Sequence, residues 1–64
     1  MKKTLLKNKR RSNLIIITKG NEIRIMFSGW KTVKLINDDI LVFDYNNCVT
    51  DAIPVSEVKS LRIE

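Results

Sequence analysis

Apolar and polar residues alternate along most of the chain from Leu14 onward, and turn-forming residues interrupt the alternation every six to ten positions. This pattern is typical of short antiparallel strands. It predicts strands at residues 14–19, 22–27, 31–36, 39–45, 48–53 and 60–63. We therefore expect an all-β domain of five or six short strands.

The first predicted hairpin has Gly20-Asn21 between its two strands. A two-residue loop suits this dipeptide, because glycine tolerates a positive φ at its first position. Such a loop pairs Lys19 with Glu22, which is a favourable match of opposite charges across the strands. The inward residues of this hairpin are then expected to be Leu14, Ile16, Thr18, Ile23, Ile25 and Phe27.

The later strands are separated by two asparagine-containing turns, at residues 37–38 and 46–47. Asparagine accepts left-handed backbone conformations, which makes both turns plausible on chemical grounds. The first of them sets Val33 beside Val42 in the core and Lys31 opposite Asp44.

The C-terminal segment 53–63 begins with an Ile-Pro-Val-Ser-Glu-Val element, which predicts a single 3₁₀ turn over residues 55–58 before a last strand. This segment resembles the end of SH3-like and Sm-like barrels, in which an apolar-Pro-apolar-Ser-x-apolar element precedes the closing strand. The resemblance implies a small five- to six-stranded barrel. Sm proteins also carry an Asp-x-x-x-Asn element and an Arg-Gly or Lys-Gly loop. Residues 44–47 match the first only distantly and the second is missing, so no RNA-binding residues are carried over.

The composition removes most of the groups on which enzymes and metal sites depend. The chain of 64 residues has no histidine, and Cys48 is its single cysteine, so neither an internal disulfide nor a multi-cysteine metal site can form. Turn chemistry accounts for the one adjacent acid pair, Asp38-Asp39. No apolar run is longer than that of residues 14–17, which is far shorter than the roughly 20 residues of a membrane span. We expect a cytoplasmic protein without enzymatic activity, cofactor or metal.

The net charge of +5 is concentrated in the first twelve residues, which hold six cations and no acid. Residues 13–64 hold six cations and seven acids and are almost neutral. We divide the chain into a basic N-terminal arm, 1–12, and a β-barrel domain, 13–64. The arm has three interpretations: a phosphate-binding segment, a disordered tail that aids solubility, or a short helix that docks through Leu5 and Leu6. Because the alternation begins after the arm, a chain without residues 1–11 is expected to fold.

The basic arm favours nucleic-acid binding, in which lysine and arginine side chains track phosphates. A partly exposed Trp30 could stack on bases. The candidate contact residues are Lys2, Lys3, Lys7, Lys9, Arg10, Arg11, Trp30, Lys31 and Lys34.

The alternative is a protein-binding module, such as a small phage-encoded inhibitor or an accessory subunit. Abundant isoleucine, lysine and asparagine suggest the AT-rich genome of a phage or mobile element. The expected interface is the apolar face formed by Ile15, Ile17 and Met26, because exposed apolar clusters usually mark an interaction surface. The same face predicts a homodimer or larger ring.

Overall fold

The computed structural model describes residues 2–64, which form seven β-strands and one 3₁₀ turn. The elements are β1 (Lys2–Lys7), β2 (Leu14–Thr18), β3 (Ile23–Met26), β4 (Trp30–Ile36), β5 (Asp39–Asp44), β6 (Val49–Pro54), η1 (Val55–Glu57) and β7 (Val58–Ile63). The expected all-β class is confirmed. Within residues 2–64 no helix is both long and apolar enough to cross a membrane.

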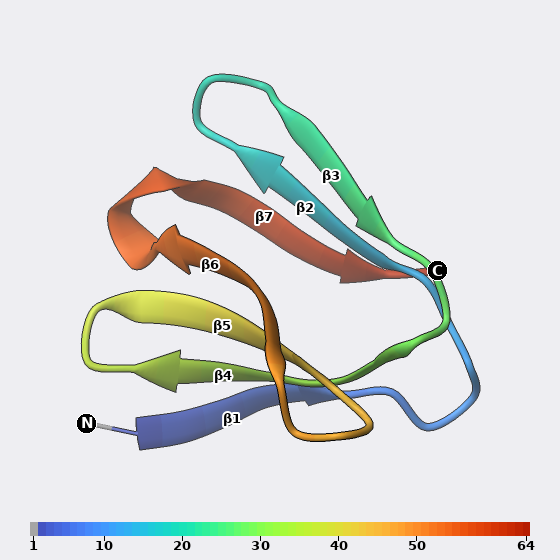
Figure 1. Cartoon of the computed structure of the whole chain (residues 1–64). Coiled ribbons are helices and arrows are strands. Elements are labelled where there is room, and N and C mark those ends of the chain that lie inside the picture. Colours follow the sequence, from blue (N-terminus) through green and yellow to red (C-terminus); the bar gives the residue numbers. More distant parts are fainter. Residues whose placement is uncertain (1) are drawn as a thin grey trace.

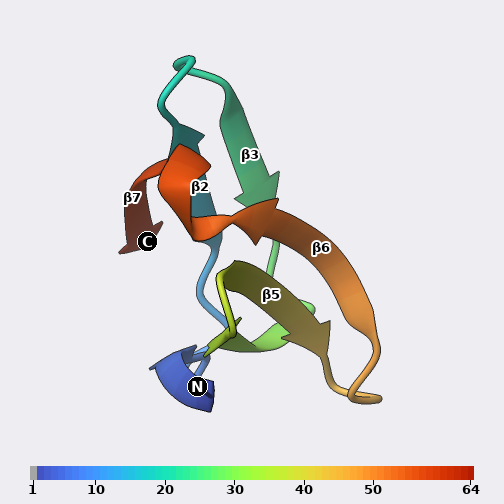
Figure 2. The same cartoon turned by 90° about the vertical axis from the view of Figure 1, so that its left-hand side faces the viewer.

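The strands form two antiparallel sheets, ordered β1-β4-β5-β6 and β3-β2-β7 (Figure 1). Figure 2 shows the sheets enclosing a common interior, with β3 next to β6 and the end of β7 above β1. No backbone ladder joins the two sheets at either place. The sheets therefore do not close into a barrel, and the expected SH3-like or Sm-like barrel is not confirmed.

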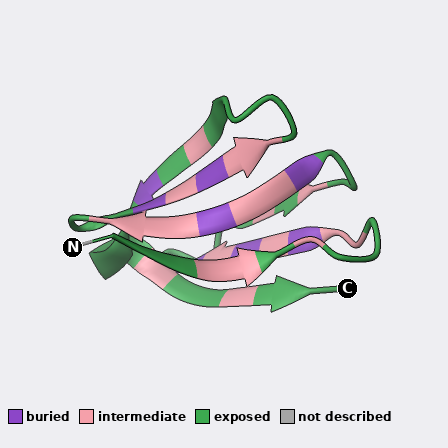
Figure 3. Cartoon of the chain, turned by 90° about the horizontal axis from the view of Figure 1, so that it is seen from below, coloured by how far each residue is buried: buried purple, intermediate pink, exposed green. Residues whose placement is uncertain are grey.

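The core fills the space between the two sheets with residues from both. In Figure 3 the buried positions lie along the inner strands, whereas the strand that ends at the C-terminus is mostly exposed. Residues Leu14, Ile16, Trp30, Val33, Ile40, Val42 and Ile53 are buried, and Leu5, Leu6, Met26, Leu35, Val58 and Leu61 pack against them.

The first hairpin has a three-residue loop, so its register differs by one residue from the expected one. The N–H of Thr18 donates to the carbonyl oxygen of Glu22 at 2.9 Å, and the N–H of Asn21 donates to that of Thr18 at 2.9 Å. Asn21, rather than Gly20, adopts a positive φ of 65°. A turn followed by one left-handed residue is the usual way to build a three-residue hairpin loop.

This register reverses the faces of β3, because side chains alternate along a strand. Ile16 lies opposite Arg24 instead of Ile25. The expectation that Ile23, Ile25 and Phe27 are core residues is wrong: they are 63%, 50% and 72% exposed. Leu14, Ile16 and Thr18 of β2 are buried as expected.

The second hairpin has the expected turn and core pairing. Asn37 has a positive φ of 55°, and Val33 pairs with Val42. The expected pairing of Lys31 with Asp44 is wrong, because the register shifts between Trp30 and Thr32 and places Trp30 opposite Asp44.

The remaining turns also follow the sequence pattern. Asn47 adopts a positive φ of 61° in the turn before β6. The predicted 3₁₀ turn is present as η1, and the last strand starts at Val58, two residues earlier than expected.

The basic N-terminal segment is part of the fold, because residues 2–7 form β1 at the edge of the four-stranded sheet. The backbone of β1 pairs with β4 from Lys2↔Ile36 to Lys7↔Thr32. Leu5 and Leu6 pack against the core, so the expected docking residues are right, but they dock as a strand and not as a helix. Segments 1–12 and 13–64 thus share one sheet.

A pair of alanine variants tests the hairpin register. Ile16→Ala removes fully buried methylene groups and should lower the free energy of unfolding by about 2–5 kcal/mol. Ile25→Ala changes a half-exposed side chain and should lower it by less than about 1 kcal/mol. Urea denaturation measures both. Equal losses would instead support the two-residue loop, in which both side chains face the core.

Deletion of residues 1–11 tests the role of β1. The deletion removes a paired edge strand and two leucines from a domain whose total stability is only about 3–5 kcal/mol. We now expect the shortened chain to be unfolded by circular dichroism and by the loss of amide dispersion in NMR spectra. A cooperative unfolding transition in the shortened chain would contradict this role.

Candidate nucleic-acid interface

The outer face of the four-stranded sheet collects lysine side chains from β1 and β4. Residues paired across antiparallel strands share a face, and Lys34 pairs with Thr4 on one side and with Leu41 on the other. The same face carries Lys2, Thr4, Lys7, Thr32, Lys34, Ile36, Asp39, Leu41 and Phe43, as the pairings show. Asp39 is the single acid of these nine residues and lies at the end of β5.

An aromatic ring lies next to these lysines on the outer face. Phe43 pairs with Thr32, and the Nζ of Lys34 lies 5.2 Å from the centroid of its ring. A lysine at this distance from a ring face makes a cation–π interaction. The sheet thus offers a ring and cations together, which are the two groups that a nucleotide base and its phosphate require.

Three further cations lie on the loop between β1 and β2, which is held in place by the side chain of Asn8. Its Nδ2 donates to the carbonyl oxygens of Ser28 at 3.1 Å and of Trp30 at 2.8 Å, and its Oδ1 accepts from the N–H of Ser12 at 2.8 Å. The indole N–H of Trp30 donates to the carbonyl oxygen of Ser12 at 2.9 Å. Lys9, Arg10 and Arg11 are exposed between these anchor points.

A shallow hollow at the end of this loop is lined by Arg11, Ser28 and Tyr45. Tyr45 is 54% exposed. Arg11 has a φ of 52°, in the left-handed region that is uncommon for residues other than glycine. The hollow therefore places a second aromatic ring beside a cation of the basic loop.

These cations are not neutralised by acids of the chain. The ion pairs within residues 2–64 involve only Arg24, with Glu22 at 3.3 Å and Asp51 at 2.9 Å, and Arg62, with Glu64. The pKa of Arg24 is raised above its usual value, first by the hydrogen bond to Asp51 and then by the charge of that carboxylate. Arg24 joins β3 to β6 and has a structural role, whereas the cations of the basic segment form no salt bridge within residues 2–64.

The structure separates the expected contact residues into several groups. Lys2, Lys7 and Lys34 share the outer face; Lys9, Arg10 and Arg11 share the basic loop. Lys3 pairs with Leu35 on the opposite side of the sheet, although it is exposed at its end. Lys31 is half-buried, with its Nζ 3.5 Å from Asn47 Oδ1. Trp30 is only 2% exposed and cannot stack on a base, because its ring fills the core.

Two aromatic residues of this surface, Phe43 and Tyr45, were not among the expected contact residues. Phe43 pairs with Thr32 on the lysine face. Alternation along β5 accounts for this position, because Phe43 directly follows Val42, which faces the core. The position of Tyr45 directly before the Asn46-Asn47 turn predicts a partly exposed ring, and the structure confirms this exposure.

The apolar face on which an interface was expected consists partly of other residues. Ile15 pairs with Ile25 and Ile17 with Ile23, so these four isoleucines share the outer face of the three-stranded sheet. Met26 is wrongly included in the expected patch, because it pairs with buried Leu14 and packs against the core.

Within residues 2–64 no group of three or more potential histidine, cysteine or acidic ligands lies close enough to hold a metal ion. Comparisons with protein-family models, with curated proteins and with solved structures find no match.

The variant Asn8→Ala tests the anchoring of the basic loop. It removes the donor for two carbonyl oxygens and the acceptor for Ser12, and should lower the free energy of unfolding by about 1–3 kcal/mol. Amide exchange at residues 9–12 should also become faster. Asn46→Ala is the matched control, because within residues 2–64 the exposed side chain of Asn46 makes no hydrogen bond. Equal effects of the two variants would show that the loop does not depend on Asn8.

Proposed function

We propose that this chain is a non-enzymatic module that binds single-stranded nucleic acid across the outer face of the four-stranded sheet. The observation that carries the proposal is the combination of Lys2, Lys7 and Lys34 with the Phe43 ring on one face. The lysines would contact phosphates and the ring would stack on a base. The anchored loop Lys9–Arg11 would extend the phosphate path towards Tyr45.

A sheet face favours single strands over duplex. Bases of a single strand are free to stack on an aromatic ring, whereas those of a duplex already stack on one another. Recognition of duplex DNA by base contacts usually needs a helix or a β-ribbon that enters the major groove. The outer face of a four-stranded sheet is too broad to enter that groove.

Two further assignments belong to the same proposal. The first is a cytoplasmic location, in keeping with a free and exposed Cys48. The second is an SH3-like or Sm-like architecture, for which the supporting feature is the 3₁₀ turn directly before the last strand.

The salt dependence of binding to a fluorescently labelled oligothymidine of fifteen nucleotides tests this function. With about four phosphate contacts, the affinity should fall about 50-fold between 50 and 200 mM NaCl, because each contact releases counterions. Lys34→Gln should reduce the slope of log K against log salt by about 0.7, the value of one contact with a single strand. Fluorescence anisotropy measures both quantities.

Lys59→Gln on β7 is the matched control, because it removes the same charge from an exposed strand of the other sheet. It should leave the salt slope unchanged. Equal slopes for the two variants would indicate attraction by overall charge and would contradict a site on the outer face. Absence of oligothymidine binding at 50 mM NaCl would contradict the function itself.

The second candidate function is protein binding through the four isoleucines Ile15, Ile17, Ile23 and Ile25, with a homodimer as the simplest assembly. The observation that favours it is the exposure of Ile23 and Ile25 on a sheet face that needs no apolar residues for folding. Ile23→Lys should then lower the mass measured by light scattering at high micromolar concentration. An unchanged monomeric mass in both proteins would rule out this assembly.

A further inference from the structure

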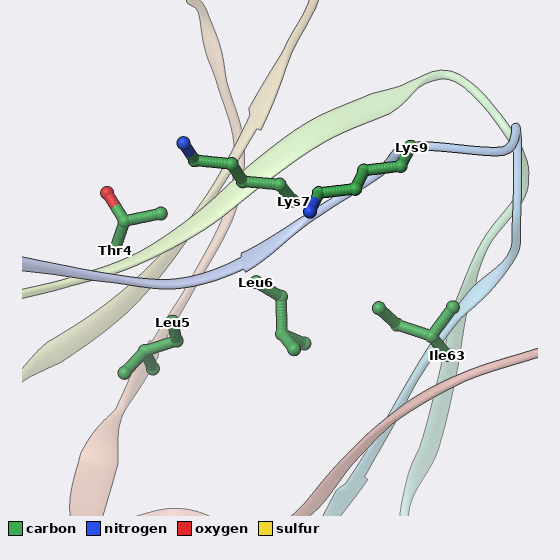
Figure 4. A pocket seen from close by; sticks show the side chains of 6 residues that line it. All are labelled: Thr4, Leu5, Leu6, Lys7, Lys9 and Ile63. Atoms are coloured by element: carbon green, nitrogen blue, oxygen red, sulfur yellow. The ribbon is translucent and has the colours of Figure 1, made fainter.

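The two sheets have four free strand edges, and two of these, on β1 and β7, lie on the same side of the molecule. β1 is the first strand of one sheet and β7 the last of the other, so each pairs on one side only. Between them lies a groove lined by Thr4, Leu5, Leu6, Lys7, Lys9 and Ile63 (Figure 4). Free edges of this kind accept an additional strand.

A bulge in β1 supplies two of the three apolar residues that line the groove. The pairing with β4 shifts between Thr4 and Leu6, which leaves Leu5 as the extra residue. Successive side chains of a regular strand point to opposite faces, but a bulge can turn one of them. Figure 4 shows Leu5 and Leu6 on the same side of β1, facing the space towards Ile63.

The fold leaves the apolar residues that line the groove partly exposed. Leu5 and Leu6 are only half-buried, and Ile63 is 40% exposed at the end of β7. Across the molecule, Arg24 and Asp51 join β3 to β6 by an ion pair. The β1–β7 side has no such ion pair within the described residues. An extended apolar segment would therefore gain contacts here that the chain itself does not supply.

The charges around the groove indicate which charge a binding partner would need. Lys7 and Lys9 belong to its lining, and neither has a carboxylate within salt-bridge distance among residues 2–64. The adjoining loop adds Arg10 and Arg11. A second copy of this chain would bring the same basic segment to the groove and be repelled by it. An acidic partner would be attracted.

We propose that the groove between β1 and β7 binds an extended acidic peptide segment of another protein, which adds a strand to the free edge of β1. Alternate apolar side chains of the peptide fill the space between the two leucines and Ile63. The acidic side chains pair with Lys7 and Lys9. This site shares Lys7 and Lys9 with the proposed nucleic-acid path but does not include Lys34 and Phe43, and a protein partner goes beyond the proposed nucleic-acid function.

The probe is a fluorescein-labelled octapeptide of alternating valine and glutamate, with a valine–lysine octapeptide as its charge control. Fluorescence anisotropy with the full chain should show saturable binding of the glutamate peptide and at least tenfold weaker binding of the lysine peptide. Amide exchange should slow along β1 in the presence of the glutamate peptide. Absence of saturation at 1 mM, or equal affinities for the two peptides, would overturn the proposal.

Two variants locate the binding. Ile63→Glu and Lys9→Glu each place a negative charge at the groove. Each should lower the affinity for the glutamate peptide at least tenfold. Ile23→Glu is the matched control. Ile23 is also an exposed isoleucine, but it lies on β3, at the opposite edge of the sheet that contains β7. Thermal melts identify any variant that does not fold, and Lys9 lies on an exposed loop whose anchors are other residues.

Two further outcomes of these experiments would overturn the proposal. Unchanged peptide affinity in folded Ile63→Glu and Lys9→Glu would overturn the groove as the site. The chain could instead bind oligothymidine and not the glutamate peptide. If Ile63→Glu then abolished the binding of oligothymidine, the choice of partner would be overturned. Failure of the nucleic-acid proposal is seen separately, in the salt slope of Lys34→Gln, so each proposal can fail alone.

Discussion

The side chain of Asn8 fixes the place where the chain passes between its two sheets, and most of the surface described above depends on it. The chain leaves the four-stranded sheet after β1 and returns to it at β4. Asn8 bonds to Ser12 on the outgoing segment and to Ser28 and Trp30 on the returning one. Trp30 completes the connection by donating to Ser12 while its ring fills the core. The side-chain amide of Asn8 therefore sets the end of β1, the shape of the basic loop and the position of Trp30, the only tryptophan of the sequence.

Interruptions of regular pairing decide which side chains reach the surface. The extra loop residue before β3 turns Ile23 and Ile25 outward and brings Arg24 to Asp51. The bulge in β1 brings Leu5 and Leu6 to one side of the strand. Because side chains alternate with a period of two, a shift of one residue exchanges the two faces of a strand. The apolar patch and the apolar groove thus both arise from single-residue irregularities and not from composition.

These irregularities also explain what could be predicted from the sequence. Alternation and turn residues suffice for the all-β class, for the pairing of Val33 with Val42 and for the 3₁₀ turn before the last strand. They do not reveal whether a Gly-Asn pair forms the whole loop or part of a longer one, since both loops accept these residues. β1 was missed because six cations in twelve residues obscured its strand pattern. Its pairing is supplied by β4, which is distant in sequence, and no local propensity predicts such a partner.

The outer face and the groove meet along β1, which has consequences for ligands at the two sites. Lys7 lines the groove and also pairs with Thr32 of the lysine face, so its charge acts on both sides of the strand. Electrostatic interactions extend about 8–10 Å at moderate salt, which exceeds the distance across a strand. An acidic peptide in the groove would lower the positive potential that attracts phosphates to the outer face. By linkage, nucleic acid on the outer face would lower the affinity for the peptide by the same factor by which the peptide lowers the affinity for nucleic acid. The two anionic ligands would thereby compete, because both use Lys7 and Lys9, although the peptide lies in the groove and the base stacks on Phe43 of the outer face.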